Sequence, residues 1–294
     1  MAQTTLKVKK SGALNKKTTS EYILYSIVFL VFLFFAFTYV YMVFWCFYSG
    51  LRTADQVAVN PFGFSAINFA NYLDVFTIME TNGVGFIEMT LNSVYFSLIG
   101  CGIQIMLTTM LAYVCCKYSF PGSKLIYNVV LVVIMLPIYG SGTAMYRLLY
   151  RMGIMNSRLM IITSIGGFNI QFLYMHSFFS GVSWSYGEAA EIDGANDWQI
   201  FFRVMFPQSI AMVGSLYVLM WITEWNQYAS ALIYLPKLPT LSVGIYQFRT
   251  QMVYDSKMNI LYAGCFVSMI PPLLIFILCN GVLMNNISLG GIKE

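Results

Sequence analysis

The sequence predicts an all-α, polytopic membrane protein with six transmembrane helices. Apolar residues make up 59% of its 294 residues and charged residues only 10%, whereas roughly a quarter of the residues in soluble domains are charged. Apolar segments that approach the ~20 residues needed to cross a bilayer recur along the whole chain. The stretches between them leave no room for a separate ATPase or receptor domain. We therefore expect one continuous helical membrane domain.

The six expected spans differ in how continuous they are. They cover residues 22–48, 90–114, 125–146, 159–180, 209–234 and 259–284. The third and fourth contain helix-breaking and polar residues, namely Pro137, Gly140, Gly142, Gly166, Gly167, Asn169, Gln171 and His176. Such residues are tolerated in a membrane only where neighbouring helices or a water-lined cavity satisfy the freed backbone groups. These two spans are therefore expected inside the bundle.

The first apolar segment follows a basic stretch, so a cleaved secretory signal is an alternative. Its apolar run of about 26 residues exceeds the ~7–15 of a signal peptide core, and no small-x-small cleavage pattern follows. The sequence favours a retained signal-anchor helix.

The distribution of basic residues predicts the orientation. The N-terminal segment is rich in lysine, with Lys7, Lys9, Lys10, Lys16 and Lys17. By the positive-inside rule this end is cytoplasmic, and an even number of spans places both termini there. Basic residues that this topology leaves outside argue against it: Arg147, Arg151, Arg158, Lys237, Arg249 and Lys257. The expected organisation is a cytoplasmic tail (1–21), a transmembrane domain (22–284) and a second cytoplasmic tail (285–294).

The sequence offers little for covalent chemistry. It has one histidine, His176, and six cysteines without the C-x-x-C spacing of a zinc or redox site. Gly140-Ser141-Gly142-Thr143 lacks the lysine of a phosphate-binding loop. We predict no catalytic residues and no metal, and we expect the cysteines to pack as small apolar residues.

A polar segment between the fourth and fifth spans predicts two short helices. Ser185 and Glu188 have the spacing of a capping box, so a helix is expected from Tyr186. Gly194 is placed to end that helix in the left-handed conformation. Asn196 and Gln199 then offer a cap for a second helix.

The second helix is expected to be amphipathic. Trp198, Phe201, Phe202 and Met205 follow an i, i+3, i+4, i+7 pattern, and Pro207 is expected to redirect the chain into the fifth span. Two interpretations remain open on these residues alone. The segment is either a surface that docks on another protein or an amphipathic loop at the lipid headgroups.

This segment closely resembles the E-A-A-x-x-x-G-A loop of permeases from binding-protein-dependent ABC importers. The matching residues, in order, are Glu188, Ala189, Ala190, Asp193, Gly194, Ala195, Phe206 and Pro207. The resemblance implies a type I ABC importer permease fold in which residues 183–207 form a cytoplasmic coupling loop. In that family the glutamate pairs with an arginine of the ATP-binding subunit, which assigns coupling to Glu188, Ala189, Ala190, Asp193 and Gly194.

Further motifs narrow the resemblance to carbohydrate-uptake permeases like the smaller membrane subunit of the maltose transporter. They are Asn68-Phe69-Ala70-Asn71-Tyr72, Thr90-Leu91-Asn92-Ser93, Ala112-Tyr113, Phe120-Pro121-Gly122, Met135-Leu136-Pro137, Trp225-Asn226, Pro239-Thr240-Leu241 and Gly290-Gly291-Ile292-Lys293. This resemblance implies import of sugars, with oligosaccharides favoured, across a bacterial cytoplasmic membrane. The alternative is an importer of a non-sugar solute.

The same resemblance implies the partners. A second permease, two ATP-binding subunits and an extracytoplasmic sugar-binding protein are expected beside membrane lipid, and no nucleic acid. ATP and Mg²⁺ are expected on the ATP-binding subunits and no cofactor on this chain. Two rival classes remain: a membrane enzyme, which would need a carboxylate pair or metal cluster, and a channel or secondary carrier, which would work without ATP.

One polar cluster falls within the expected fifth span. Glu224 is the only acidic residue deep in a predicted span, and a charge at mid-bilayer costs at least about 2.5 kcal/mol unless it is paired or faces water. It should therefore face the bundle interior. Trp225, Asn226 and Tyr228 follow it and add aromatic, amide and hydroxyl groups. The cluster either lines a translocation pathway or holds helices together, as polar residues in membranes also do.

Overall fold

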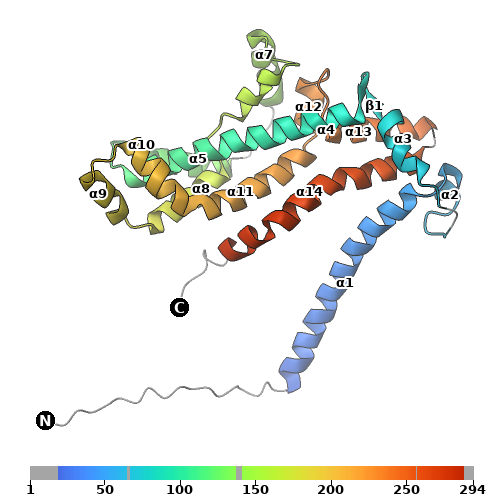
Figure 1. Ribbon diagram of the computed structural model, residues 1–294, viewed down its shortest axis with the longest axis horizontal. Coiled ribbons are helices and arrows are strands. Elements are labelled where there is room, and N and C mark those ends of the chain that lie inside the picture. The colour runs from blue at the N-terminus through green and yellow to red at the C-terminus, as the bar shows by residue number, and fades with distance from the viewer. Residues whose placement is uncertain (1–18, 65–66, 137–140, 256, 288–294) are drawn as a thin grey trace. The chain divides into compact units, whose positions relative to one another are not determined.

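A computed structural model describes residues 19–64, 67–136, 141–255 and 257–287 of the chain. The chain forms two compact units, residues 1–46 and 47–294. The described part of the first unit belongs to the long helix α1 (Thr19–Gly50; Figure 1). The sequence of this helix is mostly apolar. Most of the expected N-terminal tail and the Gly290-Gly291 segment of the C-terminal tail lie outside the described residues.

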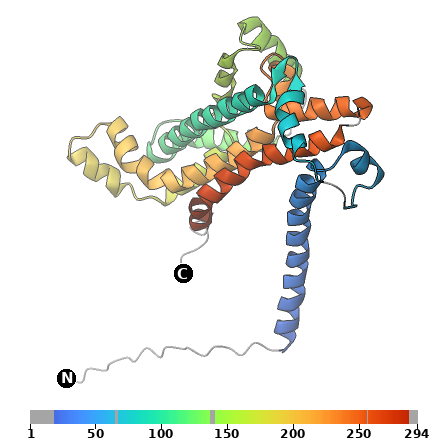
Figure 2. The ribbon, with the colours of Figure 1, turned by 45° about the vertical axis from the view of Figure 1, so that its right-hand side comes forward.

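The second unit is almost entirely helical, so the predicted all-α fold is confirmed (Figure 2). Its only strands among the described residues form a two-stranded antiparallel hairpin that turns at Asn82 and Gly83, both with positive φ, as a type I′ turn requires. The elements are α2 (Ala54–Val59), α3 (Ala70–Ile78), β1 (Glu80–Thr81), β2 (Val84–Gly85), α4 (Phe86–Val94), the π-helix η1 (Tyr95–Ile99), α5 (Gly100–Lys117), α6 (Ser123–Met135), α7 (Ser141–Met152), the 3₁₀-helix η2 (Arg158–Ser164), α8 (Ile170–Gly181), α9 (Ser185–Ile192), α10 (Asp197–Gln199), the π-helix η3 (Ile200–Met205), α11 (Phe206–Asn226), α12 (Ala229–Tyr234), α13 (Leu241–Asp255) and α14 (Met258–Ile287).

By length and composition, four helices in the described part of the chain could cross a membrane. They are Thr19–Gly50, Phe86–Lys117, Asp197–Asn226 and Met258–Cys279. Helix η1 joins α4 to α5, and η3 joins α10 to α11, so two of these long helices contain a π-helical segment. The chain is thus a multi-pass membrane protein, and the count of six spans remains a prediction.

The third and fourth expected spans are not continuous helices in the structure. Helix α6 ends at Met135 because Leu136 takes an extended conformation (ψ 119°), the conformation favoured immediately before a proline. Pro137 itself lies outside the described residues, and α7 starts the helix anew at Ser141. In the fourth span a 3₁₀-helix is followed by an irregular stretch, and α8 begins only after Asn169, whose side chain accepts a hydrogen bond from the amide of Phe172 at 3.1 Å.

The fifth expected span also has different bounds. Its helix begins earlier, at Asp197, and ends at Asn226 instead of Tyr234, because Gln227 takes an extended conformation (ψ 113°) before α12 starts. Residues 235–258, which connect the fifth and sixth expected spans, contain helix α13.

The core of the second unit lies among its long helices. Helix α5 packs against α8 and α11, and α11 packs in turn against α14. Three side chains of α8, Phe172, Met175 and Phe179, have no exposed surface. They meet buried residues of α5 and α11, including Tyr113 and Trp221, in one continuous apolar cluster. This arrangement fixes both ends of α5 and α11, where the candidate sites lie.

The Asn-Tyr motif of residues 71–72 closes the C-terminal end of α1. The buried side-chain amide of Asn71 donates to the carbonyls of Gly50 at 2.9 Å and Arg52 at 2.7 Å. The hydroxyl of Tyr72 donates to the carbonyl of Phe47 at 2.9 Å. The last carbonyls of a helix have no partner within it, so this motif satisfies groups that would otherwise be buried without a hydrogen bond.

Replacing Asn71 with alanine should therefore destabilise the protein. Two carbonyls lose their donor, and a buried unsatisfied group costs about 1–3 kcal/mol, so the free energy of unfolding in detergent should fall by about 2–4 kcal/mol. Thr77→Ala on the same helix is the matched control, because among the described residues the exposed Thr77 hydroxyl bonds to no group but the carbonyl of Asp74 in its own helix. Equal effects of the two substitutions would contradict the capping role of Asn71.

Candidate functional site

The docking loop, defined as residues 183–207, begins differently from the prediction. Helix α9 starts at Ser185, one residue early, because the amide of Glu188 donates to the carbonyl of Trp184 at 3.1 Å. Trp184 has helical backbone angles and no side-chain cap bond. The hydroxyl of Ser185 lies instead 2.8 Å from that of Ser183. The predicted capping box of Ser185 and Glu188 is therefore wrong.

The turn between the two helices of the loop agrees with the prediction. Gly194 has φ +81°, and its amide donates to the carbonyl of Glu191 at 2.9 Å, while the amide of Ala195 donates to the carbonyl of Ala190 at 2.9 Å. This pair of hydrogen bonds is a Schellman motif, which favours glycine at the left-handed position. Asn196 and Gln199 then form a reciprocal capping box at the start of α10. The predictions that Gly194 ends the first helix and that Asn196 and Gln199 cap the second are therefore confirmed.

The predicted apolar stripe divides into two faces. Phe201 and Met205 are buried, whereas Trp198 and Phe202 are 62% and 44% exposed. The exposed pair stacks, with ring centroids 6.1 Å apart and an interplanar angle of 14°. The cause is η3, because a π-helix bonds residues five apart and so turns less per residue than the α-helix assumed in the prediction.

The predicted redirection of the chain at Pro207 is wrong. Residues Asp197–Asn226 form one continuous helix through this proline. Pro207 lies in the first turn of α11, immediately after the π-helix. Its missing N–H falls where the hydrogen-bond register changes from π to α, so the proline does not break the helix.

The predicted coupling residues lie on the surface of the loop. Glu188, Ala189, Asp193 and Gly194 are exposed, and Ala190 is half-buried against the core. Among the described residues, nothing forms a hydrogen bond or ion pair with the carboxylate of Glu188. The loop thus presents a free carboxylate beside small side chains, which lets another surface approach closely.

Two tyrosines at the C-terminal end of α5 hold the docking loop in place. The hydroxyl of Tyr118 donates to the carboxylate of Asp197 at 2.8 Å, and its ring lies 5.9 Å from that of Trp184. The ring of Tyr113 lies 5.1 Å from that of Phe201. In the sequence, Tyr113 stands out only as part of the Ala112-Tyr113 motif, and no motif points to Tyr118. Its position just after a long apolar segment and before Phe120-Pro121-Gly122 was the available signal.

The protonation state of Tyr118 suits this contact. Burial raises the pKa of its hydroxyl, and the hydrogen bonds with Tyr113 and Asp197 raise it further. The ordinary pKa of tyrosine is about 10. Tyr118 is therefore a hydrogen-bond donor to Asp197 at every physiological pH, and this contribution to stability is lost only when the pH rises through the raised pKa.

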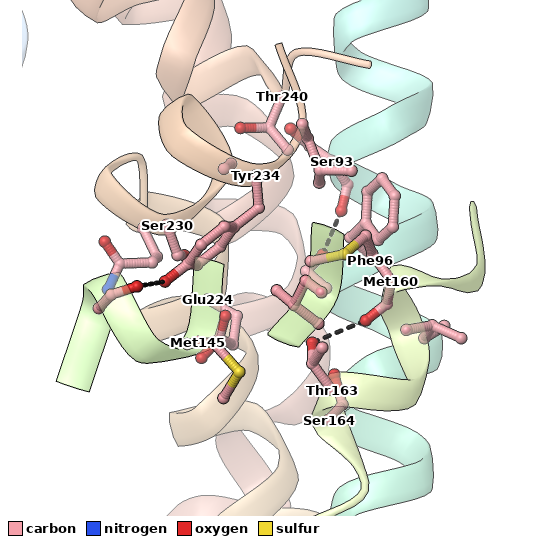
Figure 3. Close-up of a pocket in the computed structure, with 17 residues that line it drawn as sticks. Ser93, Phe96, Met145, Met160, Thr163, Ser164, Glu224, Ser230, Tyr234 and Thr240 are labelled. Atoms are coloured by element: carbon pink, nitrogen blue, oxygen red, sulfur yellow. Dashed lines mark hydrogen bonds between the residues drawn. The ribbon is translucent and has the colours of Figure 1, made fainter. Parts of the chain in front are cut away.

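The four predicted pathway residues do not form one cluster. Trp225 is buried, and its indole N–H donates to the carbonyl of Ser268 at 3.2 Å, which joins α11 to α14. Tyr228 stacks on Tyr246, with ring centroids 4.5 Å apart. The amide of Asn226 donates to the carbonyl of Ile222 in its own helix. Of the four, Glu224 lines the cavity shown in Figure 3, and the other three are not among the residues that line it.

The cavity has a volume of about 370 Å³. Its walls come from η1, α7, η2, α11 and α12, and they carry hydroxyl groups together with apolar side chains (Figure 3). In the part of the chain that the structure describes, no group of three or more His, Cys, Asp or Glu side chains could hold a metal ion. The hydroxyl groups and apolar side chains of these walls are suited to binding an organic molecule by hydrogen bonds and apolar contact.

Residues 104–287 match the family described as binding-protein-dependent transport system inner membrane component. The chain is 28% identical over 251 residues to the diacetylchitobiose uptake system permease protein NgcG of Streptomyces coelicolor, covering 84% of this chain and 82% of that protein. It is 22% identical to the arabinooligosaccharides transport system permease protein AraQ of Bacillus subtilis, covering 83% of this chain and 84% of that protein. It is 28% identical to the maltose/maltodextrin transport system permease protein MalG of Salmonella typhimurium, covering 64% and 66%.

The fold is also similar to that of a solved structure. A chain of a bacterial ABC transporter involved in the import of the acidic polysaccharide alginate superposes with a TM-score of 0.75. The match covers 90% of this chain and 98% of that chain at 19% sequence identity. At this identity the likeness concerns the fold alone.

Replacing Tyr118 with phenylalanine should loosen the docking loop. The substitution removes one hydrogen bond to a carboxylate. Hydrogen bonds to charged groups contribute at most about 1.5–3 kcal/mol to stability. Amide hydrogens of residues 185–199 should exchange several-fold faster in the purified protein, while those of α8 keep their protection. Tyr186→Phe serves as the control, because Tyr186 is 56% exposed. Unchanged exchange in Tyr118→Phe would contradict the anchoring role.

Proposed function

Because the chain belongs to the family of binding-protein-dependent transport system inner membrane components, we propose that it is a permease subunit of a bacterial ATP-driven sugar importer. It forms the translocation pathway with a second permease subunit. Two ATP-binding subunits and an extracytoplasmic sugar-binding protein complete the importer. ATP and Mg²⁺ are bound by the ATP-binding subunits, and this chain carries no cofactor of its own.

The names of the relatives support a carbohydrate as the substrate. They include uptake systems for diacetylchitobiose, arabinooligosaccharides and maltodextrin. These relatives share a substrate made of several linked sugar units. We therefore favour an oligosaccharide over a monosaccharide or a non-sugar solute.

The geometry of the docking loop is the observation that carries the coupling proposal. Its exposed carboxylate, Glu188, lies next to Ala189 on a short helix. That helix is held by the Schellman turn at Gly194 and, through the bond from Tyr118 to Asp197, by the end of α5. A carboxylate on a firmly held helix can pair with an arginine of the ATP-binding subunit and transmit the movement of that subunit to the membrane helices.

The orientation follows from this assignment. A loop that docks on an ATP-binding subunit must face the cytoplasm, where ATP is available. The lysine-rich N-terminus supports the same side for both termini. We propose a multi-pass protein of the cytoplasmic membrane with both termini inside.

Substituting Glu188 with alanine should uncouple the importer. Breaking a buried charge pair at an interface costs about 2–5 kcal/mol, so ATP-driven uptake of neutral oligosaccharides should fall about tenfold or more. The measurement is uptake of a sugar panel by proteoliposomes that contain the whole importer, with and without ATP. Subunit composition is checked in the same samples.

The matched control is Glu191→Ala, which removes an exposed carboxylate from the same helix. It should leave uptake close to that of the unaltered importer. Equal loss in both variants would show that the charge of the helix matters and not Glu188 in particular. Sugar uptake that needs neither ATP nor the ATP-binding subunits would replace the proposal with a secondary carrier.

The orientation has its own test. Single cysteines introduced at Ser183 and at Asn82 should lie on opposite faces of the membrane. In intact cells a membrane-impermeant thiol reagent should label the cysteine at position 82 but not the one at position 183. Labelling in the opposite order would invert the proposed topology.

A further inference from the structure

The cavity beside Glu224 lies within this one subunit. Ser93, Phe96 and Ser97 come from the end of α4 and from η1, Thr163 and Ser164 from η2, and Ser230 and Tyr234 from α12 (Figure 3). Its volume of about 370 Å³ falls in the range of ~300–1,000 Å³ that small-molecule sites occupy. The π-helix η1 contributes part of the wall, and π-helical segments occur frequently at functional sites.

Several polar side chains of the cavity have no hydrogen-bond partner among the described residues. Among the described residues, nothing forms a hydrogen bond with the carboxylate of Glu224 or with the hydroxyls of Ser164 and Ser230. Other hydroxyls are already engaged: Ser97 donates to the carbonyl of Ser93 at 2.6 Å, and Ser93 accepts from the amide of Leu241 at 2.7 Å. The unused groups supply both hydrogen-bond donors and a strong acceptor.

The charge that lines the cavity is of one sign, negative. Among the described residues that line it, Glu224 is the only charged side chain, and no lysine or arginine is present. A carboxylate forms stronger hydrogen bonds with hydroxyl donors than a neutral acceptor does. It also repels a second carboxylate held nearby, because like charges in a partly desolvated site disfavour each other.

From these observations we infer that the cavity is a binding site for an uncharged, hydroxyl-rich sugar unit in this subunit, and that Glu224 rejects uronic acids. The inference rests on the proposed function and specifies its substrate class. The carboxylate of Glu224 accepts hydrogen bonds from sugar hydroxyls. The rings of Phe96 and Tyr234 offer apolar surface to the faces of the sugar ring.

The fold alone does not determine this selectivity. A chain with a similar fold belongs to an importer of the acidic polysaccharide alginate, so the architecture is compatible with an anionic substrate. Discrimination between anionic and neutral sugars must come from particular side chains in a site. In this chain the side chain in position to discriminate is Glu224.

The test measures occupancy of the cavity directly. Ser230, which faces the cavity, is replaced by cysteine in the assembled importer, and its reaction with a maleimide is followed with and without ATP. Neutral tetrasaccharides of glucose, arabinose and N-acetylglucosamine are compared with tetrasaccharides of galacturonate and mannuronate. At a concentration about ten times the Kd, a bound sugar should slow the reaction about tenfold.

We expect protection by at least one neutral tetrasaccharide and none by the uronates. Adding Glu224→Gln should weaken protection by the neutral sugar and reduce the difference between the two classes, whereas Thr223→Val on the neighbouring position should change neither. Ser183→Cys in the docking loop serves as a labelling control that no sugar should protect. Reactivity of the native cysteines is subtracted with the unaltered chain.

The outcomes separate this inference from the proposed function. Equal protection by uronates, or no protection by any sugar in an importer that takes up a neutral oligosaccharide, would overturn the cavity assignment and leave the importer intact. Loss of ATP-driven uptake for every sugar in the panel would instead refute the proposed function. Correct assembly of each variant is checked by ATPase activity in the presence of the binding protein.

Discussion

In the hydrocarbon of a membrane, a backbone carbonyl or amide without a partner has no water to bind, and this constraint decides where the chain can leave its helices. At three helix ends in the described part of this protein, an asparagine side chain supplies the missing partner. Asn71 closes the end of α1, Asn169 opens α8, and Asn196 opens α10. Asparagine suits this task because its short side chain carries both a donor and an acceptor. The cavity and the docking loop lie where the backbone groups freed by a helix end can find hydrogen-bond partners.

The local signals of the docking loop could be predicted from the sequence because they act over a few residues. Gly194 ends a helix and Asn196 begins one, and neither depends on distant parts of the chain. The contacts of Tyr118 and Tyr113 could not be predicted in the same way, since they join segments about 65–90 positions apart and depend on how α5 packs against α8. The division of the predicted apolar stripe into two faces has another cause. The i, i+3, i+4, i+7 pattern holds for an α-helix, whereas residues Ile200–Met205 form a π-helix.

The residues from Glu224 to Tyr228 illustrate a second limit. They are neighbours in sequence, which predicts one polar cluster. Successive residues of a helix point in directions about 100° apart, so Trp225 packs against α14 while Glu224 lines the cavity. The polar and aromatic character of these residues is visible in the sequence. Their direction on the helix is not, and it leaves Trp225 in a packing contact and Glu224 available to a ligand. Their role in a translocation pathway remains a prediction.

The uninterrupted helix from Asp197 to Asn226 gives the protein a mechanical lever. Its first turn lies in the docking loop, where Asp197 accepts a hydrogen bond from Tyr118 at the end of α5, and its last turn carries Glu224 in the cavity wall. A helix of 30 residues is about 45 Å long at a rise of about 1.5 Å per residue. A tilt of about 5° at one end therefore displaces the other by about 4 Å, which exceeds the length of a hydrogen bond. A movement imposed on the loop would thus reach the cavity as a displacement large enough to make or break contacts with a bound molecule.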